Sequence, residues 1–298
     1  ARATSRTGLS VLAPMVGTLV GTLVLLAQTS PAAAFCRTTE CNVDGVQGAR
    51  CFPEETRQTD APIPPDCGNP IGWARSCIGF SVHDVGAPTQ NIDAALAKEL
   101  LLVAFASWTE ADCGNGITPS IKVRDLGLVS CGQVEYNQQA GNANILIFRN
   151  DVWPYEGNIN ALALTTVSFD IGNGEIYDTD IEVDTADRIM QIENVVEGYD
   201  LVGVLTHEAG HALGLAHTGA PGATMTTTIQ SGNTELRSLE PDDVTGVCTA
   251  YPPGAFGEIC NPVPRHGFSA DCEADEVTTE CSVTEPPSEA LSDDRATL

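Results

Sequence analysis

The chain has 298 residues, enough for one sizeable domain with flanking segments, and its 40 acidic and 14 basic residues give a formal net charge of −26. This charge argues against nucleic acid and anionic membrane surfaces as partners, because both repel a strongly acidic protein. It is typical of a soluble, exported protein, although most of the acids could simply form a solvated surface.

Residues 1–34 are typical of a secretory signal peptide rather than of folded structure. Two arginines precede an apolar stretch rich in small residues at 9–26, and Ala32-Ala33-Ala34 offers a cleavage site. A membrane-spanning helix is the alternative, but the stretch is short for that and no basic stop-transfer segment follows it. A lipid anchor on Cys36 is a further alternative, which Phe35 disfavours. We therefore expect secretion, with no stable membrane insertion after cleavage.

Eleven cysteines follow this cleavage site, and none of them forms a CxxC pair. In an exported chain this pattern indicates a disulfide framework, with zinc–cysteine sites as the weaker alternative. We expect Cys113 to pair with Cys131 and Cys272 with Cys281, although the spacing cannot establish connectivity. The number is odd, so at least one thiol is free, paired with another chain or held in another way.

Segment 35–70 is rich in cysteine, proline and threonine and has no apolar periodicity, which predicts a small disulfide-pinned extension. After it, a helix is expected over 92–109, where Leu96, Leu100 and Val103 share a face. The pattern of apolar and β-branched residues predicts strands over 76–82, 120–125, 144–149, 161–169 and 175–184.

A second helix is expected over 201–213, with Asp200 as its N-cap, and a third helix begins near Pro241, whose fixed φ suits a first helical turn. Strands mixed with two long helices and a short third predict an α+β fold. The segment 253–298 is expected to form an acidic, cysteine-containing extension whose last residues are disordered.

Acidic residues alternate with other residues in the strand expected over 175–184. Period two places four carboxylates on one face, about 7 Å apart, where they repel one another unless water or a hard cation intervenes. The alternative is a solvated acidic face. The predicted calcium ligands are Asp170, Asp178, Asp180 and Glu182, with Asp184 continuing the same face.

The run HEAGHALGLAH at 207–217 holds three of the five histidines. Residues four apart share a helix face, so His207 and His211 can point toward one metal ion. His217 lies about 9 Å further along the helix axis, and Gly214 lets the chain turn back, because glycine accepts the conformation that ends helices. Three imidazoles with one open position suit a catalytic zinc. A helix with unrelated histidines is the alternative.

Glu208 directly follows the first of these histidines. On the same helix it lies beside the metal without ligating it, where it can accept a proton from water and deliver it to a leaving amine. The alternative is a purely structural glutamate.

The pattern His207-Glu208-x-x-His211-x-x-Gly214-x-x-His217, followed by Met225, resembles the metzincin signature. Over 71–252 the chain resembles the matrixins, the matrix-metalloproteinase branch, in a bacterial-type secreted form. This resemblance implies a metzincin-like core with a mixed, twisted sheet, two long helices and a short C-terminal helix. It also implies that Met225 forms an apolar floor beneath the histidines.

The same resemblance implies that an extended peptide or protein substrate adds antiparallel to an edge strand within 160–169. Two features depart from the family. Thr226-Thr227-Thr228 replaces the usual Pro-x-Tyr after Met225, and His83 is the single histidine between residue 71 and the zinc motif, so a second zinc has no ligands. We therefore expect a secreted zinc endopeptidase; the alternative is a non-catalytic secreted binding module on a metzincin fold.

Overall fold

The computed structural model describes residues 36–37, 69–156, 160–257, 259–273 and 295–297. The predicted signal segment 1–34 and nearly all of the predicted extension 35–70 lie outside these residues, so both assignments stay predictions. Within the described ranges, no helix is both long and apolar enough to cross a membrane.

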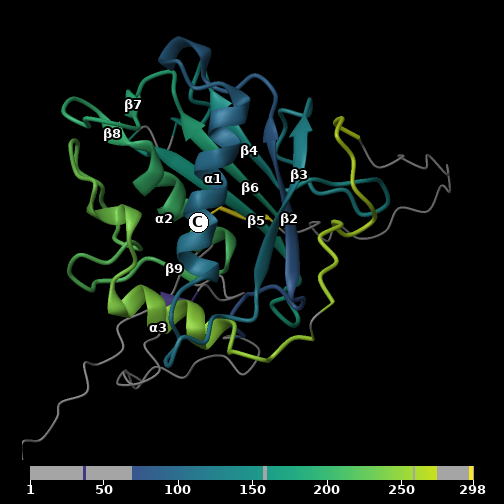
Figure 1. Cartoon of the computed structure of the whole chain (residues 1–298). Coiled ribbons are helices and arrows are strands. Elements are labelled where there is room, and N and C mark those ends of the chain that lie inside the picture. The colour runs from purple at the N-terminus through teal and green to yellow at the C-terminus, as the bar shows by residue number, and fades with distance from the viewer. Residues whose placement is uncertain (1–35, 38–68, 157–159, 258, 274–294, 298) are drawn as a thin grey trace, which may run out of the picture. The chain divides into compact units, whose positions relative to one another are not determined.

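A mixed sheet forms the frame of the fold (Figure 1). Its spatial order is β10-β5-β6-β4-β2-β3. Neighbouring strands among β3, β2, β4 and β6 are parallel, whereas β5 runs antiparallel to β6 and β10 antiparallel to β5. The strands are β2 (Cys77–His83), β3 (Lys122–Val129), β4 (Ile145–Arg149), β5 (Ala163–Phe169), β6 (Ile176–Asp184) and β10 (Arg295–Thr297).

Among the described residues, three α-helices accompany the sheet: α1 (Ala94–Thr109), α2 (Leu201–Ala212) and α3 (Pro241–Ala250). In Figure 1, α1 and α2 lie over one face of the sheet. Phe105 of α1, Leu205 of α2 and Ile181 of β6 belong to one buried cluster, which joins both helices to the sheet. The predicted α+β class, with two long helices and a short third, is confirmed.

Short elements complete the described chain. The 3-10 helices are η1 (Pro88–Gln90) and η3 (Glu235–Arg237). Two small strand pairs are β1 (Cys36–Arg37) with β9 (Leu215–Ala216), and β7 (Met190–Gln191) with β8 (Tyr199–Asp200).

Helix α2 is the central element, because all twelve of its residues are buried. The Trp108 indole nitrogen at the end of α1 donates a hydrogen bond of 2.8 Å to the carbonyl oxygen of Thr206 in α2. A helix buried on all sides is fixed by its neighbours, so its side chains are held in defined positions.

The expected disulfide pairs are wrong. Cys113 pairs with Cys248 of α3, Cys131 pairs with Cys272, and a third bridge joins Cys77 to Cys260. The physical reason is strand β3, which lies between Cys113 and Cys131 in the sequence. An eight-residue strand spans about 27 Å, so it carries these two cysteines to opposite ends of the sheet.

Candidate metal centre

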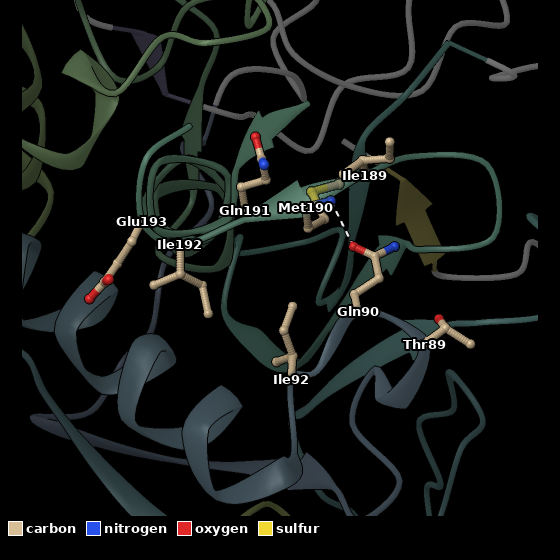
Figure 2. Close-up of a pocket in the computed structure, with 8 residues that line it drawn as sticks. All are labelled: Thr89, Gln90, Ile92, Ile189, Met190, Gln191, Ile192 and Glu193. Carbon is tan, nitrogen blue, oxygen red and sulfur yellow. Dashed lines mark hydrogen bonds between the residues drawn. The ribbon is translucent and has the colours of Figure 1, made fainter. Parts of the chain in front are cut away.

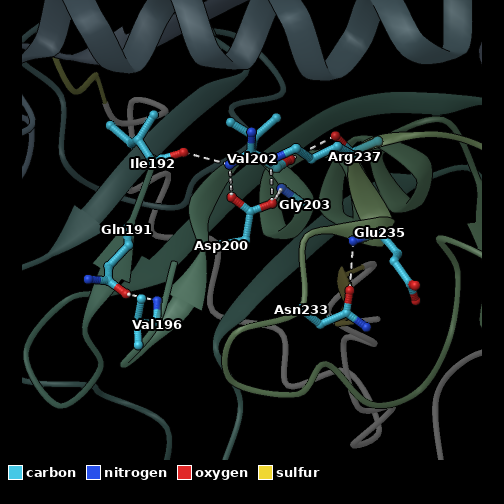
Figure 3. Close-up of polar contacts among 10 residues, drawn as sticks. Gln191, Ile192, Val196, Asp200, Val202, Gly203, Asn233, Glu235 and Arg237 are labelled. Atoms are coloured by element: carbon cyan, nitrogen blue, oxygen red, sulfur yellow. Dashed lines mark hydrogen bonds and ion pairs between the residues drawn. The ribbon is translucent and has the colours of Figure 1, made fainter. Parts of the chain in front are cut away.

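The N-terminus of α2 is fixed by Asp200, the predicted N-cap (Figure 3). Its carboxylate accepts a 3.0 Å hydrogen bond from the backbone nitrogen of Gly203 and forms an ion pair of 2.6 Å with Arg237. Arg237 also donates to the carbonyl oxygen of Ile192 at 2.5 Å. The cap therefore ties the start of α2 to two loops that precede and follow it.

The C-terminus of α2 turns at Gly214, as predicted. Gly214 has a φ of +83°, and a Cβ atom there would lie 2.6 Å from the carbonyl oxygen of Ile71. Both the left-handed backbone and the close approach require glycine. The chain then reverses through β9, which places His217 beside His207 and His211.

The three histidines converge on one point. The Nε2 atoms of His207 and His217 are 3.1 Å apart, those of His211 and His207 are 3.1 Å apart, and those of His211 and His217 are 3.2 Å apart. Tetrahedral zinc with Zn–N bonds of 2.0–2.1 Å requires nitrogen atoms about 3.3 Å apart. The geometry of the triad therefore fits a zinc ion.

The chemistry of the donor atoms fits as well. The Nδ1 atom of His207 lies 2.7 Å from the carbonyl oxygen of Thr224, and Nδ1 of His211 lies 2.8 Å from that of Leu215. A carbonyl oxygen can only accept, so each Nδ1 carries the proton and each Nε2 keeps its lone pair for a metal. Burial lowers the pKa of His207 to about 4 and that of His211 well below its usual value. The imidazoles are therefore neutral, as ligands must be.

Glu208 is buried next to the triad. The Thr165 hydroxyl of β5 donates a 2.6 Å hydrogen bond to Oε2 of Glu208, which fixes the carboxylate against the sheet edge. Burial raises the pKa of Glu208 to about 7, and the hydrogen bond from Thr165 partly offsets this rise. Carboxylates with a pKa raised toward neutrality suit proton transfer. The sequence did not single out Thr165, because its partner lies 43 residues away.

Met225 packs against α2 beneath the histidines. It is 2% exposed, and its sulfur would lie 2.3 Å from a Cβ atom at Gly210, directly before His211. Gly210 is therefore needed for the close approach of the methionine. A glycine inside a predicted helix was the available sign of such an approach.

The turn that carries Met225 is held by Asp243 of α3, a buried residue that belongs to no metal-binding motif in the sequence. Its carboxylate accepts hydrogen bonds from the backbone nitrogens of Thr224 at 2.7 Å and Met225 at 3.1 Å. The carbonyl of Thr224 in turn orients His207. Asp243 is thus a positioning residue for the triad, and α3 supports the site from outside.

Trp73 and Tyr251 complete the support of α2 at its C-terminal end. The Trp73 indole nitrogen donates to the carbonyl oxygen of Ala212 at 2.9 Å, and the Tyr251 hydroxyl donates to that of Leu213 at 2.8 Å. The last carbonyls of a helix lack partners within the helix. These two buried side chains supply the missing hydrogen-bond donors just before the turn at Gly214.

The predicted calcium ligands do not gather around a point. Among described residues, just two sets of three potential ligands have donor atoms within 4.8 Å of one another. One is the histidine triad; the other is Cys131, Glu135 and Cys272, whose two cysteines are joined in a disulfide.

The acids of β6 are buried, and two of them are bound by groups of the protein. Asp180 accepts hydrogen bonds from the backbone nitrogens of Ile145 and Glu135 at 3.0 and 3.2 Å. Glu182, with a fully buried side chain, contacts Arg149 and the Tyr155 hydroxyl.

Asp170 lies in the turn before β6, where it accepts a 2.5 Å hydrogen bond from the Tyr177 hydroxyl. Asp178 is 2% exposed. Calcium binding by these residues stays a prediction.

A separate pocket of about 410 Å³ lies between η1 and β7 (Figure 2). Gln90 spans one side of it, where its side-chain oxygen accepts a 2.7 Å hydrogen bond from the backbone nitrogen of Met190. None of the lining residues is a predicted site residue. This pocket is therefore distinct from the histidine centre.

Comparison with known proteins agrees with this geometry. Residues 133–252 match the family model Peptidase M10, described as matrixin. The chain is 26% identical to matrix metalloproteinase-C of Caenorhabditis elegans over 203 residues, and 27% identical to human matrix metalloproteinase-20 over 218 and to human neutrophil collagenase over 220 residues. The chain is therefore similar to the matrixins, and its fold is consistent with a matrixin-like metzincin core.

These alignments cover 66%, 72% and 73% of this chain but 32%, 36% and 40% of the three relatives, so the chain spans well under half of their length. The matrixin family implies a zinc ion, and the histidine triad is the described site that fits it. The family match begins at residue 133, whereas β2, α1 and β3 precede it. The matrixin-like fold therefore extends upstream of the matched residues.

Proposed function

We propose that this protein is a secreted zinc-dependent endopeptidase in which His207, His211 and His217 hold the metal and Glu208 is the general base. The observation that carries the proposal is the convergence of three Nε2 atoms within 3.2 Å, next to a buried carboxylate on the same helix. Relatives named matrix metalloproteinases support it.

Glu208 carries out the proton transfers of the reaction. When bound, zinc supplies Lewis acidity toward water and toward the carbonyl group of the scissile peptide bond. One oxygen of Glu208 takes the proton of the attacking water and then delivers it to the leaving amine. Thr165 donates to the other oxygen and thereby keeps the carboxylate aimed at the reacting atoms. No side chain forms a covalent intermediate.

The substrate is an extended peptide that adds antiparallel to the outer edge of β5, which is a form of β-augmentation. Two contacts support this edge. Thr165 of β5 touches Glu208, and the neighbouring residues 166–168 already pair antiparallel with β10. A peptide substrate would take the place of β10 along this edge.

Export fits the three disulfides at Cys77, Cys113 and Cys131, since disulfides persist in oxidising compartments.

Calcium remains a second predicted metal. Because Asp180 and Glu182 already bind protein donors, a calcium ion at these two residues would have to displace those donors.

Cleavage-site profiling on a random peptide library, together with metal analysis of the same sample, tests the proposal. We expect cleavage of internal peptide bonds that a chelator abolishes and that stoichiometric zinc restores. A protein that binds zinc and peptides but cleaves none would instead be a binding module on this fold, and the proposed activity would be wrong.

A further inference from the structure

A second cleft, of about 370 Å³, lies at the end of β5 that is away from Thr165. We call it the Arg265 cleft. The lining residues that matter here are Tyr136, Ser168, Asp170, Tyr177, Arg265 and His266. Arg265 and His266 lie beyond residue 252, where the match to the matrixin family ends. The family resemblance therefore does not account for this cleft.

Arg265 is held firmly against the rest of the fold. Asn142 donates to the carbonyl oxygen of Arg265 through its side chain at 2.9 Å and to that of Gly267 through its backbone at 3.0 Å. The disulfides of Cys260 and Cys272 anchor the segment on both sides of Arg265. The arginine therefore has a defined position relative to β5.

The guanidinium group of Arg265 is placed to bind a carboxylate. It stacks 4.0 Å from the centre of the Tyr177 ring, and Tyr177 stacks in turn on Tyr136 at 5.6 Å. Stacking uses the face of the guanidinium, and one part of its N–H edge interacts with the Tyr177 hydroxyl, so that the remaining N–H groups can reach a planar anion. None of the ion pairs in the described part of the chain involves Arg265. The neighbouring Asp170 carboxylate accepts from Tyr177 and from the backbone of Gly172, and these hydrogen bonds, together with the nearby charge of Arg265, lower its pKa.

The register of β5 relates this cleft to the proposed catalytic group. In an antiparallel pair, residues opposite each other project their side chains to the same face. The pairing of β10 places Arg295 opposite Ser168, so this edge accepts an antiparallel strand up to the cleft. Ser168 lies three residues beyond Thr165, the residue that contacts Glu208. A peptide residue opposite Ser168 therefore lies N-terminal to the bond to be cleaved and faces the cleft.

We propose that the Arg265 cleft is a substrate subsite for an acidic side chain, which lies three positions N-terminal to the peptide residue opposite Thr165. Arg265 is its specificity-determining residue. This inference rests on the proposed peptidase function and adds the substrate class that the cleft selects.

Pairs of peptides that differ by glutamate or glutamine test the subsite. The pair is made at each position on the N-terminal side of the cleaved bond, and kcat/KM is measured for each peptide. We expect a three- to tenfold preference for glutamate at one position and none at the adjacent positions, whose side chains face the other way. The adjacent positions also control for general repulsion between an acidic peptide and an acidic protein.

The variant Arg265→Gln should lose this preference, so that it cleaves the glutamate and glutamine peptides of each pair with similar kcat/KM. Arg124→Gln is the matched control, because it removes the same charge from exposed Arg124 on β3 at the opposite edge of the sheet and should keep the preference. Equal rates for both peptides at every position, or a preference that survives Arg265→Gln, would overturn the subsite.

Failure of the proposed function would look different, because no peptide would then be cleaved in a zinc-dependent way. In that case, fluorescence anisotropy with the same peptide pairs measures Kd for the native protein and for Arg265→Gln. A glutamate preference in Kd that depends on Arg265 would support the cleft as a binding site. Its absence would overturn the inference.

Discussion

Helix α2 and strand β6 both carry closely spaced side chains of the kinds that bind metals. The donor atoms of these side chains are arranged differently in the two elements. On α2 and the turn after it, three imidazole nitrogens meet within 3.2 Å. On β6 the acids stay spread along the strand, where Asp180 binds backbone nitrogens and Glu182 binds Arg149. A shared face is therefore not sufficient for a metal site. The donor atoms must also converge on one point, and other protein groups must not already occupy their lone pairs.

Removal of one converging ligand should have the largest effect. We expect His211→Ala to lose zinc and to lower kcat/KM by more than about a hundredfold, because the metal supplies several kcal/mol of transition-state stabilisation. Zinc content and peptide cleavage are measured on the same sample. His83→Ala, a histidine outside the triad, is the control. Full zinc occupancy in His211→Ala would contradict the assignment.

On the β6 side, loss of a protein donor should cost stability. Arg149→Met leaves the fully buried Glu182 carboxylate without its cation, and we expect the free energy of unfolding to fall by about 3 kcal/mol. Urea unfolding measures this change. Lys98→Met breaks the more exposed ion pair to Asp125 and should cost less than about 1 kcal/mol. Equal costs for both variants would show that Arg149 does not compensate a buried charge.

Weakening of the support beneath the triad should have an intermediate effect. Asp243→Asn keeps the size of the side chain but leaves one of the two buried backbone nitrogens of Thr224 and Met225 without an acceptor. We expect a loss of about 1–3 kcal/mol in stability and roughly 10- to 100-fold weaker zinc binding. Asp242→Asn, in the same helical turn, is the control. Unchanged zinc affinity in Asp243→Asn would show that Asp243 does not position the histidine triad.

Calcium should have the smallest effect if the β6 acids are satisfied by the protein. In that case, millimolar calcium leaves the thermal midpoint unchanged after treatment with a chelator too weak to strip zinc. A rise of several degrees in the thermal midpoint, equivalent to about 1 kcal/mol or more, would instead show that calcium binds to these acids, as the sequence predicts. The Asp180→Asn variant would then be expected to lose that shift.

The sequence predicts the local part of this fold well. Helix α2 and its Asp200 cap, the turn at Gly214 and the paired strands β5 and β6 lie within about two residues of their predicted positions, because each depends on periodicity or on one residue with a special conformation. Strand β3 runs four residues further than predicted, to Val129, through an irregularity in its pairing with β2 near Gly127.

The contacts that sequence patterns could not give are those between distant segments. Cys113 forms a disulfide with Cys248, 135 residues later, because the fold places α3 next to the segment that follows α1. Thr165 and Asp243 act on the site through partners in other elements, and neither belongs to a periodic pattern. The burial of the β6 acids also depends on Arg149 and on backbone groups of neighbouring segments.

The Glu208→Gln variant is the sharpest test of Glu208 as the general base beside the histidine triad. Glutamine preserves the size of the side chain and leaves the three histidines in place, but it cannot accept the proton. Zinc content and kcat at saturating peptide should be measured on one preparation. We expect full zinc occupancy with kcat reduced by about 10²–10⁴-fold. A variant that binds zinc and keeps more than about a tenth of the native rate would show that Glu208 is not the base.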